Sequence, residues 1–278
     1  MPPHFLQAMH EAGRTAADEP TKFALDRIQF RGDSGTIVAS DSRQALVQSG
    51  FRFPFAGDLT VPAVPVFAAK ELLGEARIGK TRSHLVVAAG DWTVWLALDP
   101  DARFPDVEPL VPKAPSGRVE FGEGDVRDLL ARGDAGRRGK SEAERAVTLD
   151  LREGRVVLRE RSQDDRVVET PLGDARYSGP PVTLALHRSH LERMLKLGFR
   201  RLDVAGPNKP VVARDGDRTY LAMVVEASAV VPDVKEPDPV ADERQQPAPR
   251  PPAAENAAVN PEPNPRAERA DEERLDPL

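Results

Sequence analysis

The chain has 278 residues, of which 40% are hydrophobic and 30% are charged, so it is long enough for about two domains with strongly ionic surfaces. It contains no cysteine, which excludes a disulfide framework, a thiolate metal site and a cysteine nucleophile. The first residues hold no basic segment followed by an apolar run, and no apolar stretch approaches the roughly 20 residues that span a bilayer. We therefore expect no signal peptide, no membrane helix and a cytoplasmic location.

The formal net charge of −6 is distributed unevenly. Residues 233–278 hold 12 acidic and 6 basic side chains, which accounts for the whole excess, whereas residues 1–232 hold 33 of each. Residues 113–232 carry 22 basic and 19 acidic side chains, a net of +3. A mean charge near zero says little about partners, so the placement of the basic residues matters more than their sum.

The first half of the chain predicts two helices and antiparallel strands. Its first residues have the spacing of a short amphipathic helix, with Phe5, Leu6 and Met9 on one face. After it we expect, in chain order, strands over 23–30 and 36–39 around a turn at 32–35, a strand over 59–61, and a second helix over 66–73.

The first half closes with a strand of alternating residues. Trp92, Val94, Leu96 and Leu98 recur at every second position, which is the period of a sheet with one buried face. This pattern predicts a hairpin that ends in an aromatic and apolar run.

The second half repeats this order of elements at an offset of about 121–125 residues. Residues 95–98, Trp-Leu-Ala-Leu, match residues 220–223, Tyr-Leu-Ala-Met. The expected elements are a helix carrying Val126, Leu129 and Leu130, strands over 147–151 and 155–158, a strand over 182–186, a helix over 189–197, and a strand over 219–225. The sequence thus predicts one α+β unit used twice, over residues 1–112 and 113–232, each with two helices packed on antiparallel sheet.

The last segment, residues 233–278, has a different composition. It contains ten prolines, no aromatic residue and few large aliphatic residues. Such a segment cannot bury enough apolar surface to offset the entropy of ordering it, so we predict a disordered acidic tail. Leu275 and Leu278 near its end fit either a plain solvated terminus or a short linear motif.

No set of residues predicts a catalytic or metal site. Residues 133–141, Gly-Asp-Ala-Gly-Arg-Arg-Gly-Lys-Ser, resemble a phosphate-binding loop, but five residues separate the glycines where the motif needs four, and the segment follows a helix rather than a strand. His187 and His190 have a spacing that metal ligands use on a helix, but no third ligand is evident, and two polar or DNA-facing histidines are the other interpretation. We therefore expect a binding protein without cofactor or metal, and not an enzyme.

The basic residues of the helix over 189–197 and of its exit form the main charge feature. Arg193, Lys196 and Arg200 follow a face away from the apolar stripe, and only Glu192 opposes them. A basic helix face is typical of a phosphate-backbone contact, and a solvated face is the alternative. The candidate DNA-binding residues are Arg14, Lys70, Arg127, Arg132, Arg188, Arg193, Lys196, Arg200 and Arg201.

Four segments together resemble one known family. Residues 39–46 (Ala-Ser-Asp-Ser-Arg-Gln-Ala-Leu), 104–112 (Phe-Pro-Asp-Val-Glu-Pro-Leu-Val-Pro), 177–195 (opening Tyr-Ser-Gly) and 220–225 (Tyr-Leu-Ala-Met-Val-Val) are similar in order and spacing to the bacterial sliding clamp, the beta subunit of DNA polymerase III. The resemblance covers residues 5–226. It implies a ring around duplex DNA, with helices lining the hole, that tethers polymerases and repair enzymes after a clamp loader places it. No catalytic residue is implied.

The family also binds partner peptides in an apolar pocket beside the linker between its last two domains. Carried over by motif position, this pocket would use Ser40, Ser42, Ala45, Pro112, Leu221, Met223, Val224 and Val225. The chain departs from the family's pattern here. Its residues 42–45, Ser-Arg-Gln-Ala, replace a glycine, histidine, arginine and leucine, and Val224 stands where the family has proline. The acidic tail is expected outside the ring, on the side of this pocket.

The family has three such domains and closes as a dimer, whereas this chain matches only the middle and last domains. A ring of six domains would then need a trimer, in which an edge strand of one subunit's first domain pairs with an edge of the next subunit's second domain. The leading hypothesis is a DNA sliding clamp or clamp-like processivity factor. The alternative is a divergent clamp paralogue that acts as a protein-interaction module without encircling DNA, and a third hypothesis is an enzyme on a similar fold.

Overall fold

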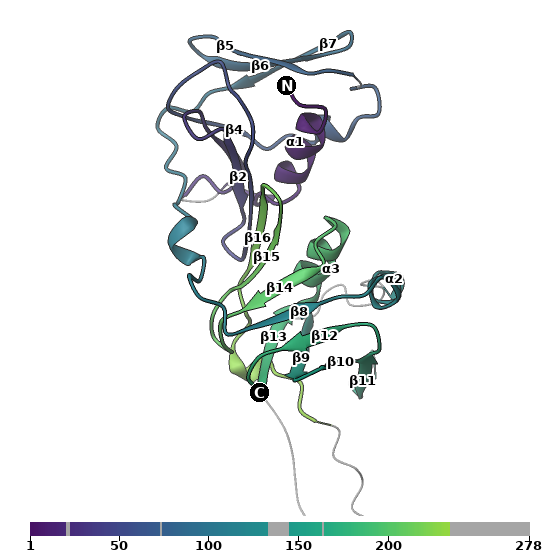
Figure 1. Cartoon of the computed structure of the whole chain (residues 1–278). Helices are drawn as coiled ribbons and strands as arrows, with labels where there is room; N and C mark the ends of the chain where they lie inside the picture. Colours follow the sequence, from purple (N-terminus) through teal and green to yellow (C-terminus); the bar gives the residue numbers. More distant parts are fainter. Residues whose placement is uncertain (21–22, 73, 133–144, 163, 234–278) are drawn as a thin grey trace, which may run out of the picture. The chain divides into compact units, whose positions relative to one another are not determined.

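A computed structural model of the chain describes residues 1–20, 23–72, 74–132, 145–162 and 164–233 (Figure 1). The chain divides into two units, Met1–Val234 and Lys235–Leu278, and every helix and strand given below belongs to the first. The predicted tail, apart from Asp233, and the loop over 133–141 lie outside the described residues. Within the described part of the chain, no helix is long and apolar enough to cross a membrane.

Residues 1–112, here the N-terminal half, begin with a helix whose apolar side packs on strands. Phe5 and Met9 of this helix are fully buried, as the amphipathic spacing predicts. The elements are α1 (Phe5–Gly13), β1 (Arg27–Arg31), β2 (Thr36–Ser40), β3 (Gln44–Gln48), β4 (Asp58–Pro62), the 3₁₀ helix η1 (Pro65–Ala68), β5 (Arg77–Lys80), β6 (His84–Ala89), β7 (Trp92–Ala97) and the 3₁₀ helix η2 (Glu108–Leu110).

Residues 113–232, here the C-terminal half, contain two α-helices and nine strands among the described residues. The elements are β8 (Gly117–Glu120), α2 (Glu123–Arg132), β9 (Ala146–Arg152), β10 (Arg155–Arg161), β11 (Val167–Leu172), β12 (Arg176–Ser178), β13 (Val182–His187), α3 (Arg188–Lys196), β14 (Arg201–Val204), β15 (Val211–Asp215), β16 (Arg218–Ala222) and the 3₁₀ helix η4 (Ala227–Ala229). The mixed α and antiparallel β content confirms the predicted α+β class.

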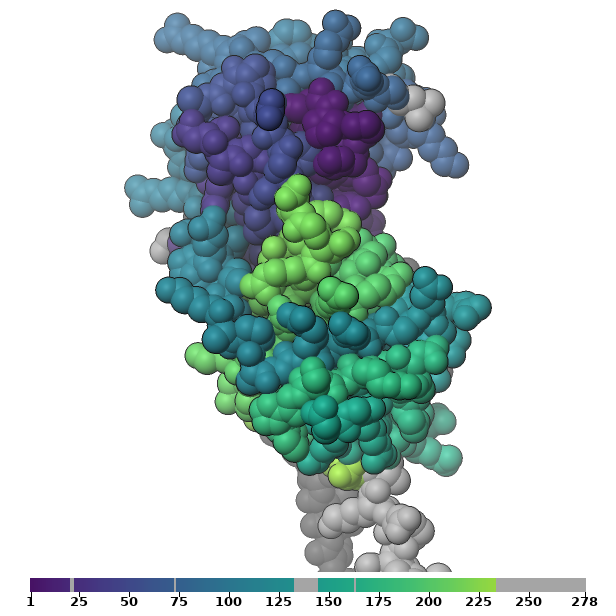
Figure 2. Space-filling view, viewed as in Figure 1, coloured from purple at the N-terminus to yellow at the C-terminus, as the bar shows by residue number. Residues whose placement is uncertain are grey.

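One sheet runs through both halves. Its nine strands lie in the order β12-β8-β14-β15-β16-β3-β2-β1-β4, and the halves meet where β16 pairs antiparallel with β3. The other sheets have the orders β11-β10-β9-β13 and β5-β6-β7. In the space-filling view, the light-green surface of the β15–β16 hairpin lies against the purple and blue surface of the N-terminal half (Figure 2).

Three clusters of buried apolar side chains support this arrangement. The largest belongs to the C-terminal half together with Leu46, and the second belongs to the N-terminal half. A smaller junction cluster joins the halves and contains Val38, Ala45, Val107, Val212 and Leu221. Two separate cores fit the predicted duplication, while the domain boundary at Pro112 stays a prediction.

The predicted helix over 66–73 is wrong. Over residues 66–72, which the structure describes, the chain forms only the short 3₁₀ helix η1, and Ala69 after it is already extended, with φ −69° and ψ 129°. Residues such as Ala, Lys and Leu favour helix by only a few tenths of a kcal/mol each, so tertiary packing readily overrides them. Here Phe67 and Leu72 both reach the N-terminal core without a continuous helix.

Two predicted strands also have different limits. The first begins at Arg27 rather than at residue 23, because Ala24 has a positive φ of 51° that breaks the extended run. The last ends at Ala222 rather than at residue 225, and beyond it Val224 forms only an isolated bridge with Leu186.

The β16–β3 junction contains a buried hydroxyl whose removal should be measurable. Tyr220 is 1% exposed, and its hydroxyl donates to Gln44 Oε1 at 2.6 Å. We expect Tyr220→Phe to lower the free energy of unfolding by about 1–2 kcal/mol, because a buried acceptor loses its donor. Urea unfolding monitored by circular dichroism measures this.

Tyr177→Phe is the matched control, since these are the only two tyrosines in the chain. Its hydroxyl donates to the carbonyl of Pro180, an exposed residue to which water has access, so the loss should be smaller. Equal losses in the two variants would contradict the importance of the junction bond.

Candidate functional site

Arg188, one of the residues predicted to contact DNA, is buried rather than exposed. Its side chain forms an ion pair with Glu160, and its Nε donates to Glu192 Oε1 at 2.8 Å. Removing one partner from such a buried pair leaves an uncompensated charge, so the arrangement serves the core. The prediction that Arg188 belongs to an exposed basic face is wrong, because two carboxylates in the interior require a cation.

Arg193 also points toward the protein. Its Nη2 donates to the Glu11 carbonyl at 2.7 Å and to Thr15 Oγ1 at 3.2 Å, so it joins α3 to the end of α1. Burial lowers the pKa of Arg193. Beside it, Arg218 Nη2 donates to Glu11 Oε2 at 2.9 Å. This Arg193–Glu11–Arg218 cluster connects the two halves, which sequence reasoning did not anticipate.

Several of the other basic residues remain on the surface, and Figure 1 shows α1, α3 and α2 following one another along one side of the molecule. Lys196 on α3 has a side chain that is 59% exposed. The Arg200 guanidinium caps α3 by donating to the carbonyls of Leu195 and Phe199. The exposed members of the predicted set are Arg14, Lys70, Arg127, Arg132, Lys196 and Arg201.

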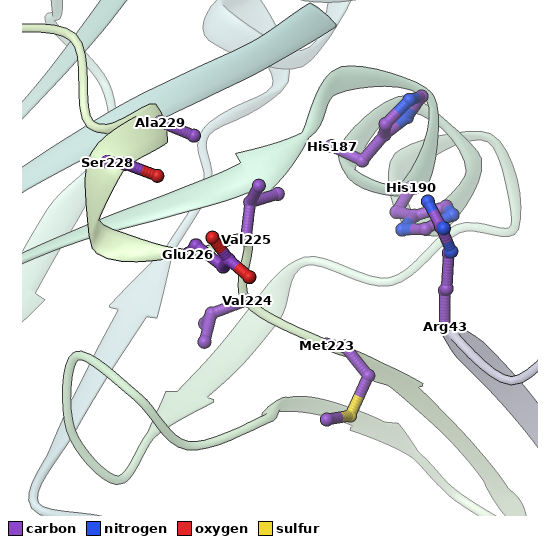
Figure 3. A pocket seen from close by; sticks show the side chains of 9 residues that line it. All are labelled: Arg43, His187, His190, Met223, Val224, Val225, Glu226, Ser228 and Ala229. Atoms are coloured by element: carbon purple, nitrogen blue, oxygen red, sulfur yellow. The ribbon is translucent and has the colours of Figure 1, made fainter. Parts of the chain in front are cut away.

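A cavity of about 430 Å³ opens where the β2–β3 turn, the start of α3 and the segment after β16 meet (Figure 3). His187, His190 and Arg43 gather at one end, Ser228 and Ala229 lie at the other, and Val224 and Val225 lie between them. The full lining consists of Arg43, His187, His190, Met223, Val224, Val225, Glu226, Ser228 and Ala229.

Backbone hydrogen bonds hold the walls of this cavity. The Met223 amide donates to the Arg43 carbonyl at 2.7 Å, and the Val225 amide donates to the Ala185 carbonyl at 2.8 Å. The Asp41 carboxylate accepts bonds from the amides of Arg43 and Gln44, which fixes the turn that presents the Arg43 side chain.

The structure brings three of the eight predicted pocket residues, Met223, Val224 and Val225, into the lining. Ala45 and Leu221 are buried in the junction cluster, against which Met223 packs. Ser40 is buried and donates to the Gln44 carbonyl, Ser42 is exposed in the turn at a φ of 79°, and Pro112 lies outside the lining.

Sequence reasoning missed the polar end of the cavity. The spacing of His187 and His190 suggests either metal ligands or two polar or DNA-facing side chains, and neither interpretation predicts a cavity wall with the two rings 5.0 Å apart at the start of one helix. Among the described residues, no group of three or more His, Cys, Asp or Glu is arranged to hold a metal ion. Both histidines line the cavity.

His190 is the most perturbed group in this wall. Its side chain is buried, and Nδ1 has no hydrogen-bond partner in the described part of the protein. Burial lowers the pKa of His190 to about 4, the neighbouring His187 and Arg43 act in the same direction, and Asp41 opposes them. The ring is therefore neutral at physiological pH, and the cavity's permanent positive charge is carried by Arg43.

No protein-family model matches the chain, and no curated protein matches it. Solved structures do match. The DNA polymerase III subunit beta from Pseudomonas aeruginosa aligns with a TM-score of 0.66 at 19% identity, covering 80% of this chain and 64% of that one. The subunit from Borrelia burgdorferi aligns with a TM-score of 0.69 at 16% identity, over 80% and 62%. The sliding clamp from Bacillus subtilis gives 0.68 at 14%, over 80% and 62%.

The chain has the fold of a bacterial sliding clamp. This confirms the resemblance inferred from its four segments, including the shortened length, because the chain spans less than two thirds of the clamps it matches. At identities of 14–19%, this similarity establishes the fold alone. The molecules that the chain binds are therefore inferred from its own residues.

Protonation of His190 should lower stability at acidic pH. Because the folded pKa, about 4, lies below the ordinary 6.5, the unfolded chain binds more protons between these values. The stabilisation is complete above pH 6.5 and is lost as the pH falls toward 4. We expect wild-type protein to lose about 2 kcal/mol more than His190→Gln between pH 7 and 5.

Denaturant unfolding at the two pH values gives the comparison, and His10→Gln controls for removing a histidine outside the cavity. If His190→Gln and wild type lose the same free energy of unfolding on acidification, the imidazole of His190 is not a buried neutral group.

Proposed function

We propose that this protein is a DNA sliding clamp or clamp-like processivity factor. The observation that carries the proposal is the row of α1, α3 and α2 along one side, with exposed cations on or directly after each helix, on a clamp fold. Arg14, Arg127, Arg132 and Lys196 supply these cations. Lysine and arginine contacts to phosphates bind duplex DNA without reading its sequence, which is what sliding requires.

The row of α1, α3 and α2 carries few exposed cations. So small a positive charge suits a ring that encircles DNA better than an open binding surface. Each exposed cation contributes only a weak, salt-sensitive attraction, so an open surface with so few cations would release DNA easily. A closed ring holds DNA by topology and needs only enough positive charge to avoid repulsion. Tethering by such a ring raises the local concentration of any bound protein at the DNA.

Ring closure requires more than one copy. If residues 1–112 and 113–232 are each one clamp domain, three copies supply the six domains of a ring. The contact between copies is then head-to-tail, because the first half of one meets the second half of the next, and such contacts close only when the rotation per copy fits. A clamp loader would open this trimer in the cytoplasm to admit DNA.

The cavity beside β16 is the proposed docking site for peptides of polymerases and repair proteins. Met223, Val224 and Val225 offer an apolar wall for aliphatic or aromatic side chains, and apolar walls with few polar groups are typical of ligand pockets. Arg43 adds a positive group at one end, which favours peptides with an acidic residue next to their apolar anchor. No catalytic residue is needed for this role.

Topological retention on DNA tests the proposal without a loader. Linear duplex DNA is fixed at one end, the protein is threaded over the free end, and that end is then blocked with streptavidin. We expect the protein to stay on blocked DNA through a wash in about 1 M salt, which screens charges beyond roughly 3 Å, and to leave after the duplex is cut.

Equal loss from blocked and unblocked DNA would contradict encirclement. If the protein fails this assay but still captures polymerase at high salt, the result favours the alternative, a protein-interaction module that does not encircle DNA.

Removing exposed cations should weaken the salt-sensitive association while leaving topological retention intact. We expect Arg127→Ala with Lys196→Ala to lower the slope of log affinity against log salt by about 2, because each phosphate contact contributes about 0.9. Arg152→Ala with Arg155→Ala, at the exposed turn between β9 and β10, is the matched control and should leave the slope unchanged. Fluorescence anisotropy with a short duplex at several salt concentrations measures the slopes, and equal slopes in both double variants would rule out α2 and α3 as the DNA face.

A further inference from the structure

A second cavity, of about 770 Å³, lies at the β4 edge of the nine-stranded sheet. Its walls are β4, the β5–β6 turn and the segment 98–104 that follows β7, and it is here named the edge cavity. Leu59 and Val61 of β4 belong to the N-terminal core, where α1 packs, so Thr60 between them faces the opposite side of the sheet. The edge cavity therefore lies on the side away from α1, and it shares no lining residue with the cavity beside β16.

Three cations line the edge cavity. Lys80 ends β5, Arg82 lies in the turn to β6, and Arg103 lies in the segment after β7. All three are exposed, and the described part of the chain supplies no ion pair or side-chain hydrogen bond to any of them. The edge cavity thus holds positive charge that the described residues do not neutralise.

The two carboxylates of the lining are already engaged. Asp99 Oδ2 pairs with Arg27 at 3.0 Å, and its Oδ1 accepts the Asp101 amide at 3.1 Å. Asp58 Oδ2 accepts the side-chain amide of Gln29 at 3.2 Å. Because Arg27 lies outside the lining and matches Asp99, only Asp58 offsets the three cations. The edge cavity is therefore net positive and suits an anion.

The hydroxyl of Thr60 is an independent sign of a ligand. Thr60 is 7% exposed, and its carbonyl accepts the Asp99 amide at 3.1 Å, but its hydroxyl has no hydrogen-bond partner among the described residues. A hydroxyl that is buried without a partner costs free energy, which a bound acceptor recovers. A phosphate oxygen in the edge cavity is such an acceptor.

Backbone bonds hold both segments that carry the cations. In the β5–β6 turn, Thr81 Oγ1 accepts the His84 amide at 2.9 Å. The segment after β7 is fixed to this turn by the Leu98 amide, which donates to the Ser83 carbonyl at 2.8 Å, and to β4 by the Asp99 amide. Walls held in this way lose little conformational entropy when a ligand binds.

We propose that the edge cavity binds a nucleoside di- or triphosphate. The three cations hold the phosphates, whose several negative charges they match, and the Thr60 hydroxyl donates to a phosphate oxygen. Leu98 and Phe104, both half-buried, line the same cavity and offer apolar surface to the base. The volume falls within the roughly 300–1,000 Å³ that is typical of small-molecule sites. This site is separate from the proposed DNA face and from the proposed peptide cavity.

Calorimetric titration of the full chain with ATP and with GTP, in the absence of magnesium, tests the site. We expect binding that weakens as salt is added, because the contacts lie near the surface. Arg82→Ala and Arg103→Ala should each weaken it about tenfold, since each removes a charge-assisted hydrogen bond to phosphate. Arg77→Ala and Arg52→Ala are the matched controls, because both arginines are exposed and neither lines the cavity. Equal losses in the cavity and control variants would overturn the proposal, as would the absence of binding at millimolar nucleotide.

Thr60→Val distinguishes a ligand contact from a structural role. It should weaken ATP binding about fivefold, yet it should not lower the free energy of unfolding of the unliganded protein, because the hydroxyl has no partner in the described structure. Unchanged affinity together with a lower free energy of unfolding would assign the hydroxyl to the fold and contradict its role in binding.

The two fragments of the probe test the ligand class. Tripolyphosphate and adenosine should each bind at least about tenfold more weakly than ATP, because each keeps only part of the contacts. Tripolyphosphate that binds as tightly as ATP would overturn the assignment to a nucleotide.

Variants elsewhere separate the edge cavity from other basic segments and from the proposed function. Arg127→Ala with Lys196→Ala on the proposed DNA face, and Lys140→Ala in the segment that resembles a phosphate-binding loop, should leave ATP affinity unchanged. Loss of ATP binding in either would place the nucleotide outside the edge cavity and overturn the proposal. Retention on blocked DNA does not involve this cavity, so ATP binding by a protein that is lost from blocked DNA would uphold the site while the clamp function fails.

Discussion

The antiparallel pairing of β16 with β3 is the constraint on which the rest of the structure depends. Its register sets Tyr220 opposite Leu46, and a slip by one residue would turn every side chain of β16 to the other face of the sheet. The same register brings Met223 beside Arg43 and so creates the cavity. It also lets α3 reach α1, where Arg193 meets the carbonyl of Glu11.

Internal polar contacts explain why the basic helix face is thinner than the sequence indicates. Arg188 neutralises Glu160 and Glu192 within the C-terminal half, while Arg193 and the partly exposed Arg218 reach across to Glu11. Such buried cations gain little net stability over apolar side chains, but each becomes costly to remove because its partners would be left unpaired. Lys196 at the end of α3 keeps its side chain 59% exposed even though its Nζ lies 3.3 Å from Glu192 Oε2.

Local patterns were enough to predict the α+β class and half of the strands of the described residues, because a period of two or 3.6 residues is a property of each segment by itself. Local patterns failed where contacts between residues far apart in the sequence determine the structure. Residues 66–73 have helical propensity, yet Phe67 and Leu72 reach the core through a 3₁₀ turn. Arg188 follows a basic pattern, yet Glu160, 28 positions earlier, draws it inside. The polar end of the cavity depends on Arg43 meeting His190, which no spacing along the chain reveals.

The junction also bears on how copies of this chain can assemble. The two halves share one continuous sheet, whose ends are the unlike strands β12 in the C-terminal half and β4 in the N-terminal half. Unlike edges generate head-to-tail growth, and what decides between a closed ring and an open filament is the rotation between the two edges within one chain. That rotation is set by β16 and β3, because they hold the halves together with buried bonds such as that from Tyr220 to Gln44. In any assembly of such copies, the pairing of β16 with β3 would therefore also fix the rotation from one copy to the next.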